Sequence, residues 1–171
     1  MSRRIASKGV LHRDYAEPMR SSSMDASLMR LSLDDMDQVA VIHRRSFDER
    51  LPWLAGLHTP DQDRTYFRDC VFTRCEVWGA SRQASLVGFV AFRKCWIDHL
   101  YVLPGQQRRG VGSSLVQFAQ AASASLLLWT FQQNAPARRF YEHHRFVVVK
   151  QTDGSDNDER EADVLYRWDR V

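Results

Sequence analysis

A short basic segment that contains two glycines is the part of the sequence best suited to chemistry. Residues 107–112 read QRRGVG and separate an apolar run that ends at Leu103 from an amphipathic segment. The first N–H groups of a helix have no partner inside the helix, and the helix dipole adds about half a positive charge there. Glycines 110 and 112 let an anion approach those N–H groups, and the two arginines add full charges. The segment predicts a phosphate-binding site.

Three classes of phosphate-containing ligand could bind to such a segment. A nucleoside triphosphate requires GxxxxGK[ST], but the chain reads GQQRRG from Gly105 and continues with Val111-Gly112, so the lysine is missing. A dinucleotide requires GxGxxG and an acidic residue about 20 positions later, and the chain has neither the third glycine nor that residue. Coenzyme A remains as the predicted ligand.

The elements that position this segment follow from hydrophobic periodicity. Alternating patterns predict consecutive strands over 76–80, 86–92 and 96–103, with a turn at 81–85. A helix follows, and its apolar stripe consists of Leu115, Val116, Ala119 and Ala122. The continuous apolar run 126–131 is typical of a buried parallel strand, so 96–131 is predicted to be a βαβ unit.

The remaining segments complete an α/β (α+β) fold. Ser27–Leu31 is predicted to be a strand, Ser32 caps a first helix, and a loop over 48–59 leads to a second helix that opens at Thr59-Pro60. The last predicted elements are a helix over 134–144, a strand over 146–150, a polar loop over 151–161 and a strand over 163–168. The order is β-α-α-β-β-β-α-β-α-β-β.

Composition restricts the class of protein. We interpret residues 1–26 as a mobile leader and residues 27–171 as one domain, a normal size for a single core. Residues 1–30 hold six Lys/Arg against three Asp/Glu, and the rest of the chain holds eighteen of each, so nucleic acid is not an expected partner. A nucleic-acid binder that uses the leader would show salt-dependent affinity that is lost when the leader is deleted.

Other features of the composition argue against membranes and metals. No apolar run approaches the roughly 20 residues that span a bilayer, and we expect a cytoplasmic protein. Three cysteines without a CxxC pair and six histidines without a metal-binding spacing predict neither a disulfide framework nor a metal site.

The motifs together resemble those of one known family. Residues 107–112 are similar to the Q/R-x-x-G-x-G/A pyrophosphate loop of the GNAT superfamily of N-acetyltransferases. Residues 98–104 resemble that family's central strand, and residues 134–142 resemble its later cofactor motif. The resemblance covers about residues 28–169 and implies the GNAT fold, a mixed sheet of about seven strands with about four helices, splayed between strands 96–103 and 126–131. The chain has Arg145-Phe146 where the family usually has Gly-Phe, so we expect a differently built turn there.

The resemblance also implies ligands and roles. Acetyl-CoA would be the acyl donor, with no metal, and Tyr141 would be the general acid that protonates the departing thiolate. The alternative for Tyr141 is that it only caps the core. The cofactor-binding residues implied are Leu100, Tyr101, Val102, Gln107, Arg108, Arg109, Gly110, Val111, Gly112, Ser113 and Asn134.

A base is a further requirement of amine acetylation. Deprotonating a lysine-like amine at pH 7 costs ~4.6 kcal/mol, whereas an α-amine costs only ~1 kcal/mol. Alternation places Asp98 on one strand face with Trp96, Leu100 and Val102, and His99 on the other with Ile97 and Tyr101. We favour Asp98 as the base or as a partner in a water relay, with His99 as second choice. A carboxylate that satisfies backbone groups at a strand bulge is the alternative.

The sequence thus predicts an N-acetyltransferase that moves an acetyl group from acetyl-CoA to a primary amine by direct attack in a ternary complex. The acceptor would be a small molecule or a peptide, and the protein a monomer or homodimer. The alternative is a non-catalytic acyl-CoA-binding regulatory module of the same fold.

Overall fold

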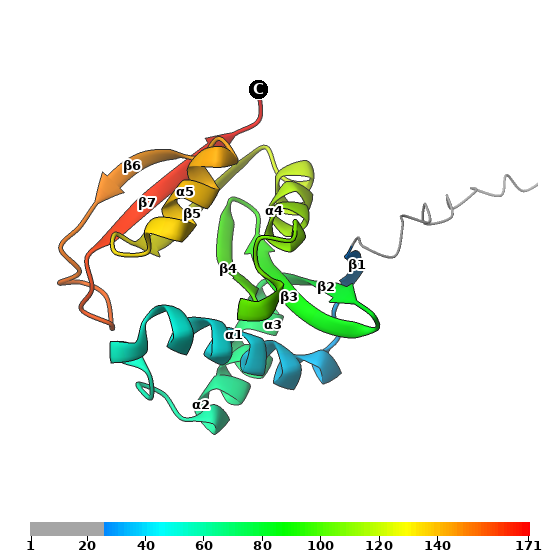
Figure 1. The fold of residues 1–171 in the computed structure, drawn as a ribbon. Coiled ribbons are helices and arrows are strands. Elements are labelled where there is room, and N and C mark those ends of the chain that lie inside the picture. The colour runs from blue at the N-terminus through cyan, green and yellow to red at the C-terminus, as the bar shows by residue number, and fades with distance from the viewer. Residues whose placement is uncertain (1–25) are drawn as a thin grey trace, which may run out of the picture.

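A single mixed sheet of seven strands forms the centre of the protein (Figure 1). The computed structural model describes residues 26–171, so the predicted leader lies outside the described residues except for Ala26. The strands run in the spatial order β1-β2-β3-β4-β5-β7-β6. Their bounds are β1 Ser27–Arg30, β2 Glu76–Arg82, β3 Ser85–Arg93, β4 Trp96–Val102, β5 Ser125–Phe131, β6 Val147–Gln151 and β7 Asp163–Asp169.

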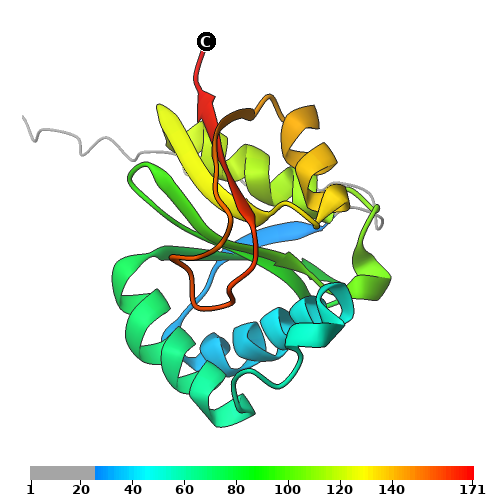
Figure 2. The ribbon, with the colours of Figure 1, turned by 90° about the vertical axis from the view of Figure 1, so that its left-hand side faces the viewer.

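Helices cover both faces of the sheet, as Figure 2 shows. One face carries α1 and a second helix that runs without a break through α2, a π-helical segment and α3, and the other face carries α4 and α5. The bounds are α1 Met36–Arg50, α2 Pro60–Thr65, the π segment Tyr66–Val71, α3 Phe72–Arg74, α4 Val111–Ala122 and α5 Ala135–His143. The predicted α/β fold and its order of elements are confirmed.

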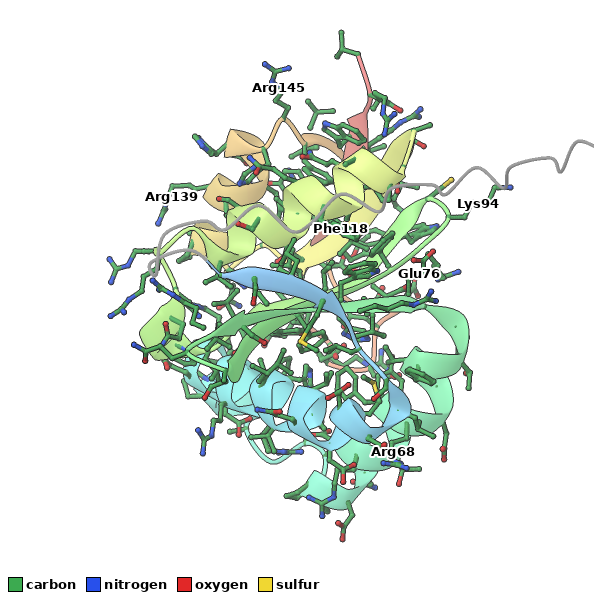
Figure 3. The ribbon with its side chains drawn as sticks, turned by 90° about the vertical axis from the view of Figure 1, so that its right-hand side faces the viewer. Arg68, Glu76, Lys94, Phe118, Arg139 and Arg145 are labelled. Atoms are coloured by element: carbon green, nitrogen blue, oxygen red, sulfur yellow. The ribbon has the colours of Figure 1, made fainter. Side chains whose placement is uncertain are left out.

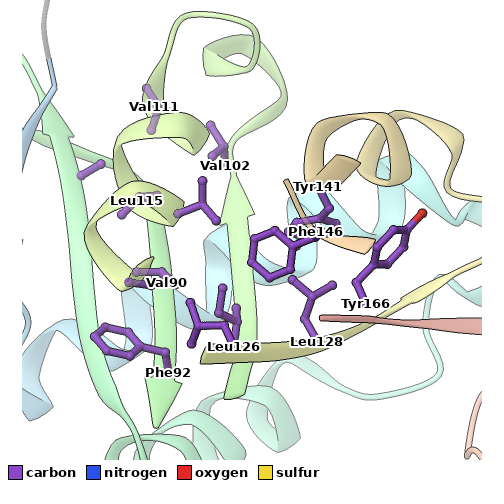
Figure 4. Packing of buried hydrophobic residues seen from close by; sticks show 14 of the residues in the cluster. Val90, Phe92, Val102, Val111, Leu115, Leu126, Leu128, Tyr141, Phe146 and Tyr166 are labelled. Carbon is purple, nitrogen blue, oxygen red and sulfur yellow. The ribbon is translucent and has the colours of Figure 1, made fainter. Parts of the chain in front are cut away.

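Each face of the sheet has its own hydrophobic core. On the α4 side, Leu115 and Val116 are completely buried in a cluster that also contains Leu126 of β5. Figure 4 shows Leu115 and Leu126 in this cluster. On the α1 side, Met36 and Phe67 are completely buried in a separate cluster. The two cores fix α1 and α4 on opposite faces of β3 and β4, the strands that carry the predicted site.

The two central strands separate along most of their length. β4 and β5 are parallel, and they are in register only at Trp96 and Leu127, where the Leu127 N–H donates to the Cys95 carbonyl at 2.8 Å. Beyond that point β4 continues to pair with β3 and β5 pairs with β7 over its whole length. In Figure 1 the two ribbons diverge from this contact. The predicted splay is confirmed, and it leaves one hydrogen-bonding edge of β4 free.

A bulge in β4 changes the predicted faces of that strand. Ala91 pairs with His99 and Phe92 pairs with Ile97, so Asp98 is the extra residue and has no partner opposite. The bulge reverses the alternation at this point, because one residue more on one strand moves its neighbours to the other face. Ile97 consequently lies in the α4-side core with Leu100, not with His99 as strict alternation predicts.

Two other boundaries differ from the sequence prediction. Helix α1 extends to Arg50, so the predicted 48–59 loop begins three residues later, and it contains a 3-10 turn at Pro52–Leu54. The β2–β3 turn is shorter than 81–85, because positions 83 and 84 both adopt left-handed backbone, with φ of 49° and 61°. A two-residue turn of this kind matches the twist of the strands that it joins.

The turn after α5 differs from the expectation, because its arginine adopts the left-handed conformation that glycine usually provides. Arg145 itself adopts the left-handed conformation, with φ of 66°, where the resemblance predicted a different turn for lack of glycine. Its side chain points away from the molecule (Figure 3), and the following residue, Phe146, is 2% exposed. The cost of a left-handed arginine is about 1 kcal/mol, which burial of a phenylalanine exceeds.

Candidate active site

A cavity of about 1080 Å³ opens between the separated strands. It is lined by residues of α1, β4, the loop before α4, β5, α5 and the β6–β7 loop. All of the predicted site residues line it except Arg109 and Val111. Those that do are Asp98, His99, Leu100, Tyr101, Val102, Gln107, Arg108, Gly110, Gly112, Ser113, Asn134 and Tyr141. Segments from His43 of α1 to Asp163 at the start of β7 therefore meet in one cavity.

The loop before α4 presents a row of free amide groups. Among the described residues, none of the N–H groups from 108 to 113 donates a hydrogen bond to another part of the chain. Arg108 and Gly110 both have positive φ, of 58° and 82°, which turns successive N–H groups toward a common side. Gln107 fastens the loop to the end of β4 through a 3.0 Å hydrogen bond from its Nε2 to the Val102 carbonyl. The arrangement is suited to an anion.

Two predicted members of this loop have other surroundings. The Val111 side chain is 1% exposed and belongs to the core, so only its backbone N–H is available to a ligand. Arg109 is exposed and does not line the cavity. Arg108, whose side chain does line it, is the arginine placed beside the free amides.

Gly112 allows α4 to lie close to α5. A Cβ added at Gly112 would meet the Phe140 ring at 3.3 Å, whereas one added at Gly110 would meet nothing within 4 Å. Gly110 is required for another reason, because its positive φ is costly for any residue with a side chain. Gly112 thus allows α4 to pack closely on Phe140, and Gly110 allows the turn before α4 without a side chain that would cover the free amides. This is the spatial requirement for a pyrophosphate group approaching the amides.

Ser113 and Asn134 border the same mouth. The Ser113 Oγ lies 3.1 Å from His144 Nε2, a half-buried contact that fixes its hydroxyl. Asn134 is the N-cap of α5 and its Oδ1 accepts from the Ala137 N–H at 3.3 Å. The Asn134 side-chain NH₂ donates no hydrogen bond within the described part of the chain, so it is free to donate to a ligand.

Tyr141 is a buried residue whose hydroxyl makes no hydrogen bond with residues 26–171. Its side chain is 8% exposed and its ring contacts those of Phe146 and Tyr166 (Figure 4). No hydrogen bond of the Tyr141 hydroxyl occurs among residues 26–171, although the residue lines the cavity. Burial raises the pKa of this phenol above its usual value. Tyr141 is therefore a protonated donor that has nothing to donate to in the free protein.

His99 lies on the α1 side of the strand, with its ring enclosed. Tyr66, from the π segment, places its hydroxyl 3.3 Å from His99 Nε2. Burial, and secondarily the neighbouring His43, lowers the pKa of His99 to about 4. At neutral pH the imidazole is uncharged and one of its nitrogens carries a lone pair.

Asp98, in contrast, is already engaged. Its carboxylate accepts from Arg93 Nε at 2.8 Å and Arg93 Nη2 at 3.2 Å, and also from the Cys75 thiol at 3.3 Å. Burial and the hydrogen bond to Asp98 raise the pKa of Cys75 to about 12, so the thiol stays protonated. The bulge predicted as an alternative for Asp98 is present, and the carboxylate serves side chains rather than backbone groups.

Sequence reasoning missed several residues of the cavity. His43 of α1 lies against the Tyr101 ring with a centroid distance of 4.7 Å, and its pKa is lowered to about 4, chiefly by burial. Ser46 donates to the Val102 carbonyl at 3.1 Å and so joins α1 to the end of β4. His43 and Ser46 are three positions apart and fall on the buried stripe of α1, which was the available signal.

Within residues 26–171, no group of three or more His, Cys, Asp or Glu side chains is arranged to hold a metal ion. None of the helices in the same range is both long enough and apolar enough to cross a membrane.

Comparisons with known proteins agree with this geometry. Residues 73–148 match the acetyltransferase (GNAT) domain family. The peptidyl-lysine N-acetyltransferase YiaC of Escherichia coli is 30% identical over 92 residues, which cover 49% of this chain and 63% of YiaC. The chain covers at most 63% of the length of the curated relatives that it matches.

Solved structures show the same fold. The apo form of YjaB from Escherichia coli superposes with a TM-score of 0.71 at 22% identity, over 84% of this chain and 97% of that one. The PaiA N-acetyltransferase of Thermoplasma acidophilum, solved in complex with coenzyme A, gives a TM-score of 0.63 at 19% identity, over 85% of this chain and 99% of that one. The fold is thus shared with a protein whose structure was solved in complex with coenzyme A.

Proposed function

This chain belongs to the GNAT superfamily of N-acetyltransferases, and on that premise we propose that it transfers an acetyl group from acetyl-CoA to a primary amine by direct attack in a ternary complex. One observation carries the proposal. The free amides of the α4 mouth, the unpaired edge of β4 and the hydroxyl of Tyr141 all border a single cavity. An anion site, a strand edge and a proton donor are together what thioester transfer to an amine requires.

The loop and the strand edge would hold the donor. The amides from 108 to 113, with the Arg108 guanidinium, would bind the pyrophosphate. The backbone of Leu100 and the N–H of Val102, on the edge of β4 that β5 leaves unpaired, would pair with the pantetheine arm as a strand does. Bound acetyl-CoA supplies an activated acetyl group as a thioester. N–H groups fixed along a strand edge stabilise negative charge on a carbonyl oxygen, because they need no reorganisation when that charge develops.

Tyr141 would protonate the leaving sulfur. A phenol with a pKa near ~10 protonates a thiolate with a conjugate acid near ~8.5 at a cost of about 2 kcal/mol. Burial raises the pKa of Tyr141, and the same surroundings would raise the pKa of a thiol, because both acids are anionic when deprotonated. The difference between the pKa of the Tyr141 phenol and the pKa of the CoA thiol therefore stays small. The absence of any competing hydrogen bond within residues 26–171 leaves the Tyr141 proton available.

Removing the proton of the amine is assigned to His99 rather than to Asp98. The carboxylate of Asp98 already accepts hydrogen bonds from Arg93 and from the Cys75 thiol. His99 is uncharged at neutral pH and lines the cavity. Asp98 would act through position, because the bulge at this residue allows Ile97 to lie in the α4-side core while His99 faces α1.

The acceptor is proposed to be a primary amine of a peptide or a small molecule. YiaC is a peptidyl-lysine N-acetyltransferase, so a lysine side chain in a peptide is the first acceptor to test. Spermidine, phenylethylamine and a peptide with a free α-amine extend the range of amine pKa and of charge.

Release of free CoA thiol from acetyl-CoA tests the proposal. We expect release that depends on the presence of at least one amine, with an equal amount of acetylated amine found by mass spectrometry. The Tyr141→Phe variant should bind acetyl-CoA and release thiol much more slowly. Tight binding of acetyl-CoA without amine-dependent release for any of these amines would instead favour a non-catalytic acyl-CoA-binding module.

A further inference from the structure

Two histidines from different elements face each other in the cavity. His43 of α1 and His99 of β4 have ring centroids 6.1 Å apart and planes at 82°. Phe67 lies 5.1 Å from the first ring and 5.2 Å from the second, and Tyr101 lies 4.7 Å from His43. Both histidines line the cavity that Tyr141 also lines. The two imidazoles are therefore polar groups in a part of the cavity that is otherwise lined by aromatic rings.

The hydrogen bonds of this pair are incomplete. His43 Nδ1 is shielded from solvent and has no partner, and no hydrogen bond of His43 Nε2 occurs among the described residues. His99 Nε2 lies 3.3 Å from the Tyr66 hydroxyl, and His99 Nδ1 makes no hydrogen bond within residues 26–171. Buried polar atoms are normally satisfied, so imidazole nitrogens without partners in a cavity are expected to meet a ligand.

Both rings are uncharged at neutral pH. Burial lowers the pKa of each to about 4, and the charges that act on them partly oppose one another. Asp63 and Asp48 raise the pKa of His43, Arg44 and His58 lower it, and Asp98 raises the pKa of His99. An uncharged imidazole can accept one hydrogen bond, and it can also accept a proton.

We propose that His43 and His99 together bind the acceptor amine and that the pair takes the proton which the amine loses on acetylation. The proposal rests on the proposed function and assigns His43 a part in it. A nitrogen that donates to both rings would lie about 4 Å from each centroid, given hydrogen bonds of about 3 Å and a ring radius of about 1.1 Å. With the centroids 6.1 Å apart, the angle at that nitrogen is about 100°, close to the H–N–H angle of an amine.

The amine enters as R–NH₂, with its two hydrogens directed at the imidazoles and its lone pair free to attack the acetyl carbon. A C–N bond forms, the C–S bond breaks, and the sulfur takes the Tyr141 proton. The nitrogen, now positively charged, passes one proton to an imidazole. The imidazolium then releases this proton to solvent, and solvent returns a proton to Tyr141. No oxidant or reductant takes part.

The site also restricts the amine. The rings favour an uncharged guest, because the surroundings that lower the pKa of an imidazole lower that of an ammonium group in the same place. Amines with a lower pKa should therefore react faster at pH 7 than alkylamines of similar size, since less free energy is spent on their deprotonation.

Four substitutions test the proposal in the full chain, with acetyl-CoA and the fastest amine of the panel. His43→Phe and His99→Phe keep a ring but remove the nitrogens, and we expect kcat/KM to fall about 100-fold or more. His43→Gln and His99→Gln can still accept a hydrogen bond but cannot carry a proton. For these two we expect KM for the amine to stay within about threefold while kcat falls at least tenfold. His143→Gln, on an exposed histidine outside the cavity, is the matched control.

The outcomes separate this proposal from the proposed function. CoA affinity, measured by calorimetry on every variant, should change less than about threefold, because neither histidine belongs to the pyrophosphate loop. If wild-type protein acetylates an amine and both Gln variants keep their kcat, the pair has no role in proton transfer and the proposal is overturned, even where a Phe variant misfolds. Partial recovery of His43→Ala by added imidazole would support it. A wild-type chain that binds CoA but acetylates no amine would overturn the proposed function itself.

Discussion

Two buried tyrosines of this protein differ in what their hydroxyl groups do. Tyr166 donates to Glu142 at 2.6 Å and accepts from Arg138 Nε at 3.3 Å, so its hydroxyl is part of the structure. Tyr141 lies 6.2 Å away, ring to ring, and its hydroxyl has no partner in the described part of the chain. A buried polar group that stability does not require is better explained by chemistry.

The two tyrosines should therefore respond oppositely to the same substitution. Tyr141→Phe should lower kcat by about 10²-fold or more and change the free energy of unfolding by less than about 0.5 kcal/mol. Tyr166→Phe leaves Glu142 without a donor and should cost about 1–2 kcal/mol of stability, with kcat close to wild type. Urea unfolding and thiol release measure both quantities. Equal loss of activity in the two variants would assign Tyr141 to the core alone.

The buried histidines predict how stability depends on pH. The pKa of His43 and of His99 is about 4 in the folded protein and about 6.5 in the unfolded chain. Between these values the unfolded chain binds more protons, so stability is complete above pH 6.5 and declines as pH falls toward 4. Each histidine contributes on the order of 3 kcal/mol to this decline.

Urea unfolding at pH 7.5 and pH 5 measures the effect. His99→Gln should lose less stability between the two pH values than wild type, whereas His143→Gln, which changes an exposed histidine, should lose as much as wild type. An identical loss in all three proteins would show that the buried imidazoles are not responsible.

The first turn of α4 depends on glycine at two positions for two reasons. Gly110 supplies a positive φ, and Gly112 supplies space next to Phe140. Gly105, five residues before Gly110, has neither a positive φ nor a neighbour within 4 Å of an added Cβ. The chain thus offers a glycine in the same loop region that should tolerate a side chain.

We expect Gly112→Val to weaken CoA binding at least tenfold, because a branched side chain would push Phe140 away and cover the free amides. Gly105→Val should leave the dissociation constant within about twofold of wild type. Calorimetric titration with CoA measures both, and circular dichroism checks the fold. Equal affinities in the two variants would mean that the α4 mouth does not hold the ligand.

The order of elements could be predicted because each has a clear period and clear ends. The position of the phosphate-binding loop could also be predicted from residues 107–112 alone, because glycines and arginines directly before a helix favour the binding of an anion. The partners of Asp98 and His99 could not be predicted. A bulge at Asp98 was one of two alternatives for this polar residue in an apolar strand. Only the pairing with β3 decides between them, and the bulge moves Ile97 to the other face. The contact of His43 with His99 depends on how α1 packs on the sheet.

The protein as a whole consists of two parts of one sheet that meet at a narrow contact. β1–β4 form one part and β5–β7 the other, and β4 and β5 are in register only at Trp96 and Leu127. A second link lies in the loops. The Glu161 carboxylate accepts from Trp53 Nε1 at 2.7 Å and from Gln133 Nε2 at 2.9 Å, which joins the α1–α2 loop to the other part.

Weakening this second link should affect the acceptor more than the donor. Trp53→Phe keeps an aromatic ring but removes the N–H that Glu161 accepts, and we expect KM for the amine to rise severalfold. The change is small because the indole is 54% exposed, and an exposed hydrogen bond contributes only about 1 kcal/mol. The dissociation constant of CoA should be unchanged. A selective loss of CoA affinity would contradict this assignment of the two loops.

The separation of β4 from β5 leaves backbone groups of β4 unpaired, which a bound ligand would satisfy. The free amides from 108 to 113 favour a ligand with an anionic group. The most direct measurement is calorimetric titration of the full chain with CoA and with acetyl-CoA. We expect saturable binding of one molecule per chain for both ligands, together with a rise in the melting temperature of the protein. Well-folded protein that gives neither heat nor a thermal shift with either ligand would contradict this expectation.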